Sequence, residues 1–236
     1  MRDAIVLAAG EGTRLRPLTE RWTKPVLPID GRPVIATLLH ELAAGGVERV
    51  WLVTGHLAEQ VESLAGDGSV FGLDLRFARQ PRPNGSADAV RCALEAGAPP
   101  EVLLSAADTL YTAGDAGRFA RAVAARPNAA GAIAFRAEAD RRHHTRIHVE
   151  AGRVLGVPDP AGAVTAAPLM ALREPVAVRM IEACRPPFRP PFEVAVAFQA
   201  AIDAGEEVVA VEIGCTRDLT HPVDLVEENF PYLRGL

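Results

Sequence analysis

A loop near the N-terminus combines glycines and cations at a spacing that suits phosphate binding. Gly10 and Gly12 directly follow an apolar run, and Arg14 and Lys24 come soon after them. Glycine lets the main chain approach a ligand closely, and successive backbone N–H groups can form a concave anion site. Lys24 is also the single lysine among the 25 lysines and arginines of the chain. The loop therefore predicts a site for a polyphosphate group.

The elements on either side of this loop predict that it lies at the edge of a sheet. Residues 3–9 form an apolar run of strand length, which ends where the glycines begin. In α/β folds, ligands bind beyond the carboxyl ends of parallel strands. The loop covers residues 10–33, and a helix with one apolar face follows it at 34–43. We therefore expect the loop to face a ligand from the carboxyl end of the first strand.

Apolar runs of strand length alternate with segments of helical period along most of the chain, which is typical of an α/β domain with a largely parallel sheet. We expect one domain over residues 1–236, because the length suits one core and no linker is apparent. The expected strands are 3–9, 49–54, 75–78, 101–106, 130–135 and 208–213, with a hairpin at 146–157, and the expected helices are 34–43, 57–64, 86–97 (capped by Ser86), 118–125, 176–184, 193–204 and one from about 222.

Composition excludes several classes of partner. The net charge of −5 argues against nucleic acid and against an anionic membrane surface. Cys92, Cys184 and Cys215 are far apart, so we interpret them as structural thiols in a reducing compartment. Neither a signal peptide nor a membrane-spanning run is apparent, so we expect the protein in the cytoplasm. A homo-oligomer is compatible with the sequence but does not follow from it.

A dinucleotide-binding site is the first alternative for the glycine loop, because its fingerprint also begins with G-x-G. The third glycine of that fingerprint is missing here, and Leu15 occupies its place. The prolines at 17, 25, 28 and 33 also predict a long ordered loop where a dinucleotide site needs an immediate helix. The sequence therefore disfavours a dehydrogenase.

The segments LAAGEGTRLRPLT and TKPVLPIDGRP resemble the signature of the sugar-1-phosphate nucleotidyltransferases, with Thr23 in place of the usual proline. The resemblance implies a Rossmann-like three-layer fold, with a mostly parallel mixed sheet flanked by helices. It also implies that Arg14 grips the distal phosphates of an NTP, and that Lys24 neutralises the phosphate under attack. We interpret Arg16 and Arg21 as solvated loop charges. By the same resemblance the nucleotide contacts fall to Leu7, Ala9, Gly10, Gly12 and Thr13.

The stretch RQPRPNGSADAV resembles the base-recognition segment of the same family, in which a glutamine precedes a glycine and a helix. Gln80 and Gly85 take these places. A glutamine side chain can pair with the edge of a base, and a glycine lets a flat ring lie against the backbone. A plain junction of strand, turn and helix, with Ser86 as N-cap, fits the local sequence equally well.

Two aspartates are the candidate ligands for Mg²⁺. Asp108 ends a buried strand in SAADT, which resembles the GDT or ADT segment whose aspartate holds magnesium; a turn or helix cap is the alternative. For the second ligand we prefer Asp218 to Glu212, because RDLTHPVDLVEEN then matches the family pattern WDIGTPEDLxxAN in register. In that alignment Asp224 falls in the first turn of a helix and is structural.

The acceptor side departs from the family. Many members carry a VEKP segment whose glutamate and lysine hold the sugar phosphate, whereas residues 157–160 read VPDP here. The run RRHHTR, with Arg141, Arg142, His143, His144 and Arg146, is either a substitute source of cations or a solvated loop. The sequence therefore leaves open a phosphorylated acceptor other than a sugar 1-phosphate.

These observations predict a magnesium-dependent transfer of NMP from an NTP to a phosphorylated acceptor, most often a sugar 1-phosphate, with release of pyrophosphate. Four histidines, His40, His56, His148 and His221, show no metal or triad spacing, and no nucleophile elbow is present. We therefore expect direct in-line attack without a covalent intermediate. A cytidylyltransferase for an alcohol or phosphonate acceptor is the nearest variant. A nucleotide-binding regulatory module of the same fold, without turnover, is the alternative from another class.

Overall fold

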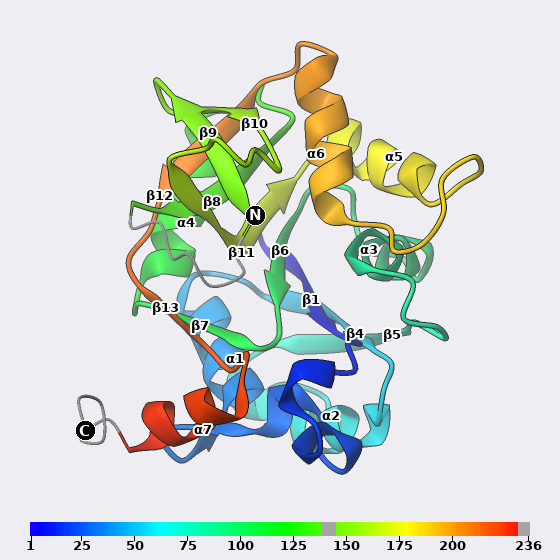
Figure 1. Ribbon diagram of the computed structural model, residues 1–236, viewed down its shortest axis with the longest axis vertical. Coiled ribbons are helices and arrows are strands. Elements are labelled where there is room, and N and C mark those ends of the chain that lie inside the picture. Colours follow the sequence, from blue (N-terminus) through cyan, green and yellow to red (C-terminus); the bar gives the residue numbers. More distant parts are fainter. Residues whose placement is uncertain (138–144, 231–236) are drawn as a thin grey trace.

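The computed structural model describes residues 1–137 and 145–230, and a nine-stranded sheet forms its centre (Figure 1). The strands lie in the order β5 (Asp74–Arg79), β4 (Arg49–Thr54), β1 (Asp3–Ala8), β6 (Val102–Ala106), β11 (Val164–Leu172), β8 (Gly131–Arg136), β12 (Val208–Glu212), β10 (Arg153–Gly156) and β9 (Arg146–Glu150). The sheet takes strands from both halves of the chain, which suits the single domain that we predict.

Seven of these nine strands run in one direction, and only β10 and β11 oppose them. The prediction of a mostly parallel mixed sheet is therefore confirmed. The strand that it missed is β11, which lies between β6 and β8. Its sequence is rich in alanine, a poor strand former, and contains Pro168. The proline lies where the pairing with β8 shifts register, between Ala166 and Met170, so the missing N–H is tolerated.

Helices cover both faces of the sheet, because side chains along each strand alternate between two cores. Ala4, Val6 and Ala8 of β1 pack in one core with α1 (Val34–Ala44), α2 (Ala58–Ala65) and α4 (Asp115–Ala124). Ile5 packs in the other core with α3 (Ser86–Glu95), α5 (Glu174–Ala183) and α6 (Val194–Asp203). The predicted three-layer α/β arrangement is confirmed.

The loop between β1 and α1 is ordered, as its prolines indicate. It contains three short 3-10 helices, Thr13–Leu15, Leu18–Glu20 and Lys24–Val26, and the hairpin of β2 (Pro28–Ile29) and β3 (Arg32–Pro33). The Thr19 hydroxyl donates a hydrogen bond to the Gly12 carbonyl at 2.9 Å. This bond closes the loop on itself.

Ser86 is not the N-cap of α3 as predicted. Gly85 holds that position with a φ of 107°, and Ser86 is the first helical residue. The Ser86 hydroxyl points to another helix: it donates to Glu193 at 2.7 Å and accepts from the Val194 N–H at 3.0 Å. It therefore ties the start of α3 to the start of α6.

Two short strands were also missed. β7 (Thr109–Tyr111) and β13 (Thr216–Asp218) form a separate antiparallel pair, which joins the segment after β6 to the C-terminal region. The helix α7 (Pro222–Asn229) follows and begins where predicted. Asp224 accepts hydrogen bonds from the N–H groups of Thr220 and His221, which confirms its structural role. No helix in the described ranges is both long and apolar enough to cross a membrane.

Candidate active site

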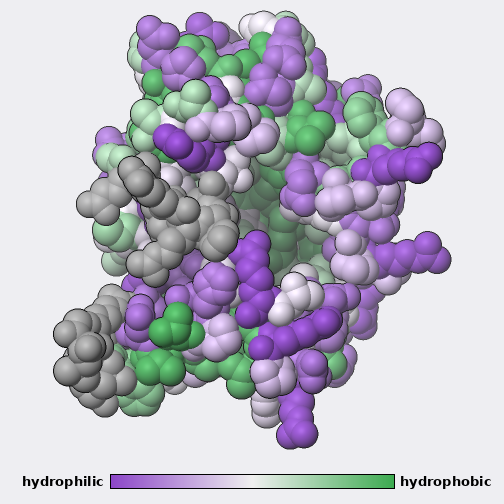
Figure 2. Space-filling view, viewed as in Figure 1, coloured by the Kyte–Doolittle hydropathy of each residue, from purple (hydrophilic) through white to green (hydrophobic). Residues whose placement is uncertain are grey.

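A cavity of about 640 Å³ lies at the carboxyl ends of β1 and β6. Figure 2 shows a hollow in this face, with a hydrophobic floor and hydrophilic side chains around it. All the site residues predicted from the sequence line this cavity. They are Leu7, Ala9, Gly10, Gly12, Thr13, Arg14, Lys24, Gln80, Gly85, Asp108 and Asp218. Their positions converge as expected, while their roles stay predictions.

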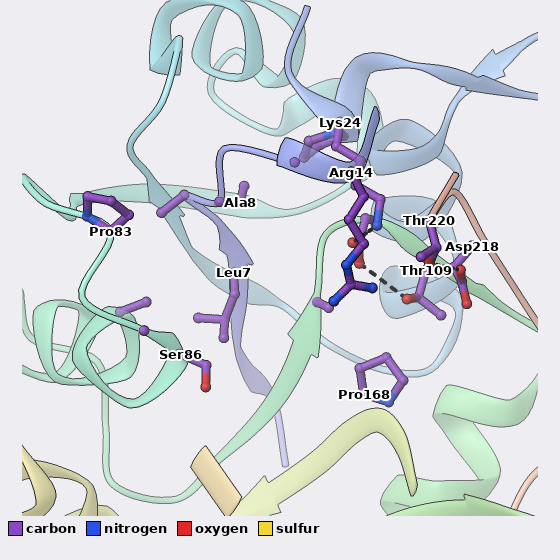
Figure 3. Close-up of a pocket in the computed structure, with 18 of the residues that line it drawn as sticks. Leu7, Ala8, Arg14, Lys24, Pro83, Ser86, Thr109, Pro168, Asp218 and Thr220 are labelled. Carbon is purple, nitrogen blue, oxygen red and sulfur yellow. Dashed lines mark hydrogen bonds and ion pairs between the residues drawn. The ribbon is translucent and has the colours of Figure 1, made fainter. Parts of the chain in front are cut away.

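The two ends of the cavity differ in character (Figure 3). Pro83 and Ser86 lie at one end, near the start of α3, and Asp218 and Thr220 lie at the other, with Leu7 between them. Arg14 reaches into the cavity from the loop. One end, the α3 end, is therefore formed by the turn before α3, with Glu193 beside Ser86, and the other, the charged end, holds Lys24, Asp108 and Asp218.

Lys24 and Asp108 form an ion pair at the charged end. The Lys24 Nζ lies 2.5 Å from the Asp108 Oδ2, and the two side chains are 17% and 28% exposed. The other oxygen of Asp108 accepts a hydrogen bond from the Thr109 hydroxyl at 3.3 Å. Because the pair is largely shielded from water, the ammonium is held over the cavity with little freedom.

Asp218 reaches the same end through the pairing of β7 with β13. In this pairing Asp218 lies opposite Thr109, the residue that follows Asp108. The Thr220 hydroxyl donates to the Asp218 Oδ1 at 2.8 Å. Two carboxylates that are far apart in the sequence thus come to the same end of the cavity.

This pair of carboxylates fits a magnesium ion that is shared with a substrate. Within the described ranges, no group of three or more His, Cys, Asp or Glu side chains is arranged to hold a metal. Mg²⁺ typically takes one or two carboxylates and completes its shell with waters and phosphate oxygens. The residues present therefore suit Mg²⁺ bound together with a nucleotide better than a metal held by protein alone.

The two loop glycines serve different purposes. Gly12 adopts the left-handed conformation with a φ of 62°, and an added Cβ would lie 3.0 Å from the Thr19 side chain, so the fold itself requires glycine there. Around Gly10 an added Cβ would meet nothing within 4 Å, so this side of the loop is open. No described residue accepts a hydrogen bond from the backbone N–H groups of residues 10–14. These donors suit an anion.

Gln80 lies buried at the α3 end of the cavity and is 6% exposed. Its Nε2 donates to the Gly85 carbonyl at 3.0 Å and to the Asp88 Oδ2 at 2.9 Å. Gly85 has a structural reason to be glycine that we did not predict. An added Cβ would collide with the backbone N and O of Phe192. The turn before α3 is therefore fixed against the segment that leads into α6.

Sequence reasoning missed the wall of the cavity that β11 provides. The Tyr111 hydroxyl donates to the Pro168 carbonyl at 2.8 Å and lies 2.8 Å from the Ser105 hydroxyl. Burial raises the pKa of Tyr111 well above its usual value, so the phenol stays protonated as a donor. The local sequence gives no signal for this wall, because the strand that forms it is rich in alanine and contains Pro168. The lining residues that were not predicted include Thr109, Thr145, Ala166, Ala167, Pro168, Met170, Glu193 and Thr220.

The basic residues outside the predicted site fall into two groups. Arg16 and Arg21 are exposed, and Arg16 pairs with Glu11 at 3.2 Å, in keeping with solvated loop charges. Residues 141–144 lie outside the described residues, and Arg146 is exposed on β9. Among the described residues that line the cavity, none comes from 157–160. Asp159 instead accepts a hydrogen bond from the Ala161 N–H of its own turn.

Comparison with known proteins identifies the family. The chain belongs to the Nucleotidyl transferase family of enzymes, which it matches over residues 3–146. It is 30% identical over 230 residues to a glucose-1-phosphate thymidylyltransferase of Streptomyces griseus, covering 96% of this chain and 64% of that protein. The chain thus spans just under two thirds of the length of this relative. The prediction of the family and of the enzyme class is confirmed.

Two further comparisons concern a solved structure with the same fold and a relative that is named for a phosphonate product. A structure described as a glucose-1-phosphate thymidylyltransferase from Bacillus anthracis superimposes with a TM-score of 0.86 at 18% identity, covering 99% of this chain and 96% of that one. At that identity the likeness shows the fold alone. Over 81 residues, 34% of this chain and 13% of the relative, the chain is 46% identical to a CMP-5'-(3-aminopropyl)phosphonate synthase of Streptomyces rubellomurinus.

Proposed function

We propose that the protein transfers a nucleoside monophosphate from an NTP to a phosphorylated acceptor, most often a sugar 1-phosphate, and releases pyrophosphate. The observation that carries the proposal is the convergence of the glycine loop, Lys24, Asp108 and Asp218 in one cavity. The family membership supports the reaction class, and the activity of this chain is our inference.

The two ends of the cavity suggest how the nucleotide lies. We assign the base to the α3 end of the cavity at Gln80 and Gly85, and the triphosphate to the loop at Gly10 and Gly12. The open backbone N–H groups of residues 10–14 provide donors for phosphate oxygens, and Arg14 adds a guanidinium that binds the distal phosphates. With the triphosphate in this place, the α-phosphate lies toward the charged end.

The reaction needs no covalent intermediate. A phosphate oxygen of the acceptor attacks the α-phosphorus of the NTP, the new P–O bond forms, and the bond to the β-phosphate breaks, so that pyrophosphate leaves. Lys24 neutralises the negative charge on the α-phosphate as attack proceeds. The loop amides and Arg14 hold the leaving pyrophosphate. Positioning and charge neutralisation supply most of the catalysis.

Asp108 and Asp218 are the residues that would hold Mg²⁺. When bound there, the ion supplies Lewis-acid polarisation and charge neutralisation at the phosphates. Without the ion, the ion pair with Lys24 offsets the charge of Asp108. The shielded carboxylate of Asp108 therefore has a cation beside it in the cavity wall.

We assign the acceptor to the part of the cavity that β11 and the neighbouring segments line, which includes Thr145, Pro168, Met170 and Glu193. A cytidylyltransferase for an alcohol or phosphonate acceptor is the second candidate. Two observations favour it. Residues 157–160 supply no glutamate and lysine pair, and the cavity is not lined from this described segment. A relative with 46% identity over its matched stretch is named for an aminopropylphosphonate product.

The experiment that tests the function is a substrate matrix. The purified chain is incubated with Mg²⁺, each of ATP, GTP, CTP, UTP and dTTP, and each of a set of sugar 1-phosphates, alcohol phosphates and phosphonates. Released pyrophosphate and the mass of the product are measured. We expect pyrophosphate and a nucleotide-linked product for at least one pairing. Nucleotide binding with no product on any pairing would instead support the regulatory module.

A further inference from the structure

The backbone just before Lys24 is held by the side chain of Gln60, which lies on α2. The Gln60 Oε1 accepts a hydrogen bond from the Thr23 N–H at 2.9 Å, and its Nε2 donates to the Arg21 carbonyl at 2.7 Å. These partners fix the orientation of the amide, because an N–H can only donate and a carbonyl can only accept. Gln60 is not among the described residues that line the cavity, so it can act on a ligand only through the loop.

Thr23 has the backbone conformation of a proline. Its φ is −68° and its ψ is 147°. The ring of proline fixes φ near −65°, and proline is also the residue that the family signature has at this position. A threonine has no ring, but it keeps the N–H that proline lacks, and this N–H is the donor to Gln60. A contact with α2 therefore stands where the signature has a covalent constraint.

The side chain of Thr23 does not hold the residue in place. Thr23 is 1% exposed, and within the part of the chain that the structure describes its hydroxyl has no hydrogen-bond partner. A buried hydroxyl without a partner costs free energy. The polar contact between Thr23 and α2 is therefore the one that its N–H makes with Gln60.

The placement of Lys24 depends on the backbone of Thr23. Thr23 is the N-cap of the 3-10 helix Lys24–Val26, and its carbonyl accepts from the Val26 N–H at 3.1 Å. A change of φ at Thr23 therefore turns this short helix, and the Lys24 side chain moves with it. The ammonium has a defined place, because the Lys24 Nζ lies 2.5 Å from the Asp108 Oδ2. The flexible stem of a lysine does not fix that place by itself.

We propose that Gln60 is a positioning residue for Lys24. It keeps Thr23 in the conformation of a proline, and in this way it places the ammonium at the charged end of the cavity. The inference rests on the proposed function only where it links this placement to turnover. The placement itself concerns the protein without ligand, so it can be measured separately.

The first measurement uses the fact that Lys24 is the single lysine of the chain. The protein is produced with ¹³C-labelled lysine, and the NMR signals of the two Cε hydrogens are recorded without nucleotide. A held side chain gives these hydrogens different shifts, whereas a freely rotating one averages them. We expect different shifts in the unchanged protein and averaged shifts in Gln60→Met, because methionine is similar in size but has no amide to bind the loop.

Thr23→Pro in the Gln60→Met protein is the rescue variant. The ring fixes φ without Gln60 and also removes the unpaired hydroxyl, so we expect the different shifts to return. Glu59→Ala, at an exposed neighbour of Gln60 on α2, is the control and should match the unchanged protein. Unfolding temperatures identify any variant that has lost the fold, and Gln60→Ala replaces Gln60→Met in that case. Different shifts in the Gln60 variant, or averaged shifts in the rescue variant, would overturn the proposal.

The second measurement concerns turnover with an NTP and acceptor that give product in the substrate matrix. Misplacement of a charge partner lowers the rate more than the affinity, so we expect Gln60→Met to lower kcat at least about tenfold and to change the KM for the NTP less than about threefold. Thr23→Pro should restore kcat. An unchanged kcat in Gln60→Met would overturn the link to turnover. If the substrate matrix gives no product, the NMR result still decides the placement of Lys24.

Discussion

The Lys24 Nζ lies 2.5 Å from the Asp108 Oδ2, although 84 residues separate the two in the sequence. The loop after β1 supplies the ammonium, and the carboxyl end of β6, next to β1 in the sheet, supplies the carboxylate. One side chain therefore has two tasks in our proposal. Lys24 holds Asp108 in the absence of ligand, and it neutralises the α-phosphate once a nucleotide is bound.

The first prediction concerns Lys24→Ala. Loss of a charge partner of the transition state costs about 3 kcal/mol, so we expect turnover to fall by roughly 100-fold or more. Affinity for the nucleotide should change less than turnover. The measurement is the steady-state rate of pyrophosphate release, with kcat and KM resolved. Arg21→Ala is the control, because Arg21 is an exposed cation of the same loop. Similar rates for the two variants would remove Lys24 from the chemistry.

The second prediction concerns Asp218→Asn. If Asp218 binds Mg²⁺ together with Asp108, an amide in its place weakens the binding of the ion. The Mg²⁺ concentration for half-maximal nucleotide binding should then rise by at least about tenfold. A titration of Mg²⁺ at a fixed concentration of the NTP that gives product in the substrate matrix, followed by calorimetry, measures this change. Asp74→Asn, an exposed aspartate at the far edge of the sheet, serves as the control. An unchanged Mg²⁺ requirement would argue that Asp218 is not a ligand of the ion.

The part of the cavity formed by the loop after β1 could be predicted from sequence because its residues lie close together in the chain. Gly10, Gly12, Arg14 and Lys24 lie in one continuous loop, so their types and spacing already indicate a phosphate site. Asp218 could be assigned to the cavity only by the family resemblance. The pairing of β7 with β13, which brings Asp218 beside Thr109, is three residues long and shows no strand pattern in the sequence.

Other features depend on tertiary contacts that leave no local signal. β11 is rich in alanine and interrupted by Pro168, so its place in the middle of the sheet follows from packing between β6 and β8 and not from propensity. Asp88 similarly reads as an ordinary acidic residue in the first turn of a helix. Its link to Gln80 becomes visible only when the strand that precedes the turn is placed beside α3.

The third prediction concerns the support of the β11 wall. Tyr111→Phe removes the hydroxyl that bridges Ser105 and the Pro168 carbonyl in the interior. A buried acceptor without a partner costs about 1–3 kcal/mol, so we expect the free energy of unfolding to fall by roughly that amount. Urea denaturation measures it. A double-mutant cycle with Ser105→Ala tests the contact between the two hydroxyls, because groups in contact give losses that are not additive. Additive losses would argue against the bridge.

The fourth prediction concerns thiol reactivity and its dependence on pH. Burial raises the pKa of Cys184 to about 11 and also raises that of Cys92, whereas Cys215 is exposed. The thiolate is the reactive form, so a raised pKa means slow reaction at neutral pH. At pH 7.5 fewer than about one in a thousand Cys184 thiols is ionised, and the ionised fraction rises about tenfold per unit of pH until the pKa is reached.

Alkylation with iodoacetamide, read by peptide mass spectrometry, checks this order. At pH 7.5 we expect Cys215 to be modified first, with Cys92 and Cys184 modified slowly and at rates that climb steeply toward pH 10. In guanidinium chloride the fold no longer buries Cys92 and Cys184, so all three cysteines should react at similar rates. Fast modification of Cys184 in the folded protein at pH 7.5 would contradict its partial burial at the end of α5, where this helix packs beside α3.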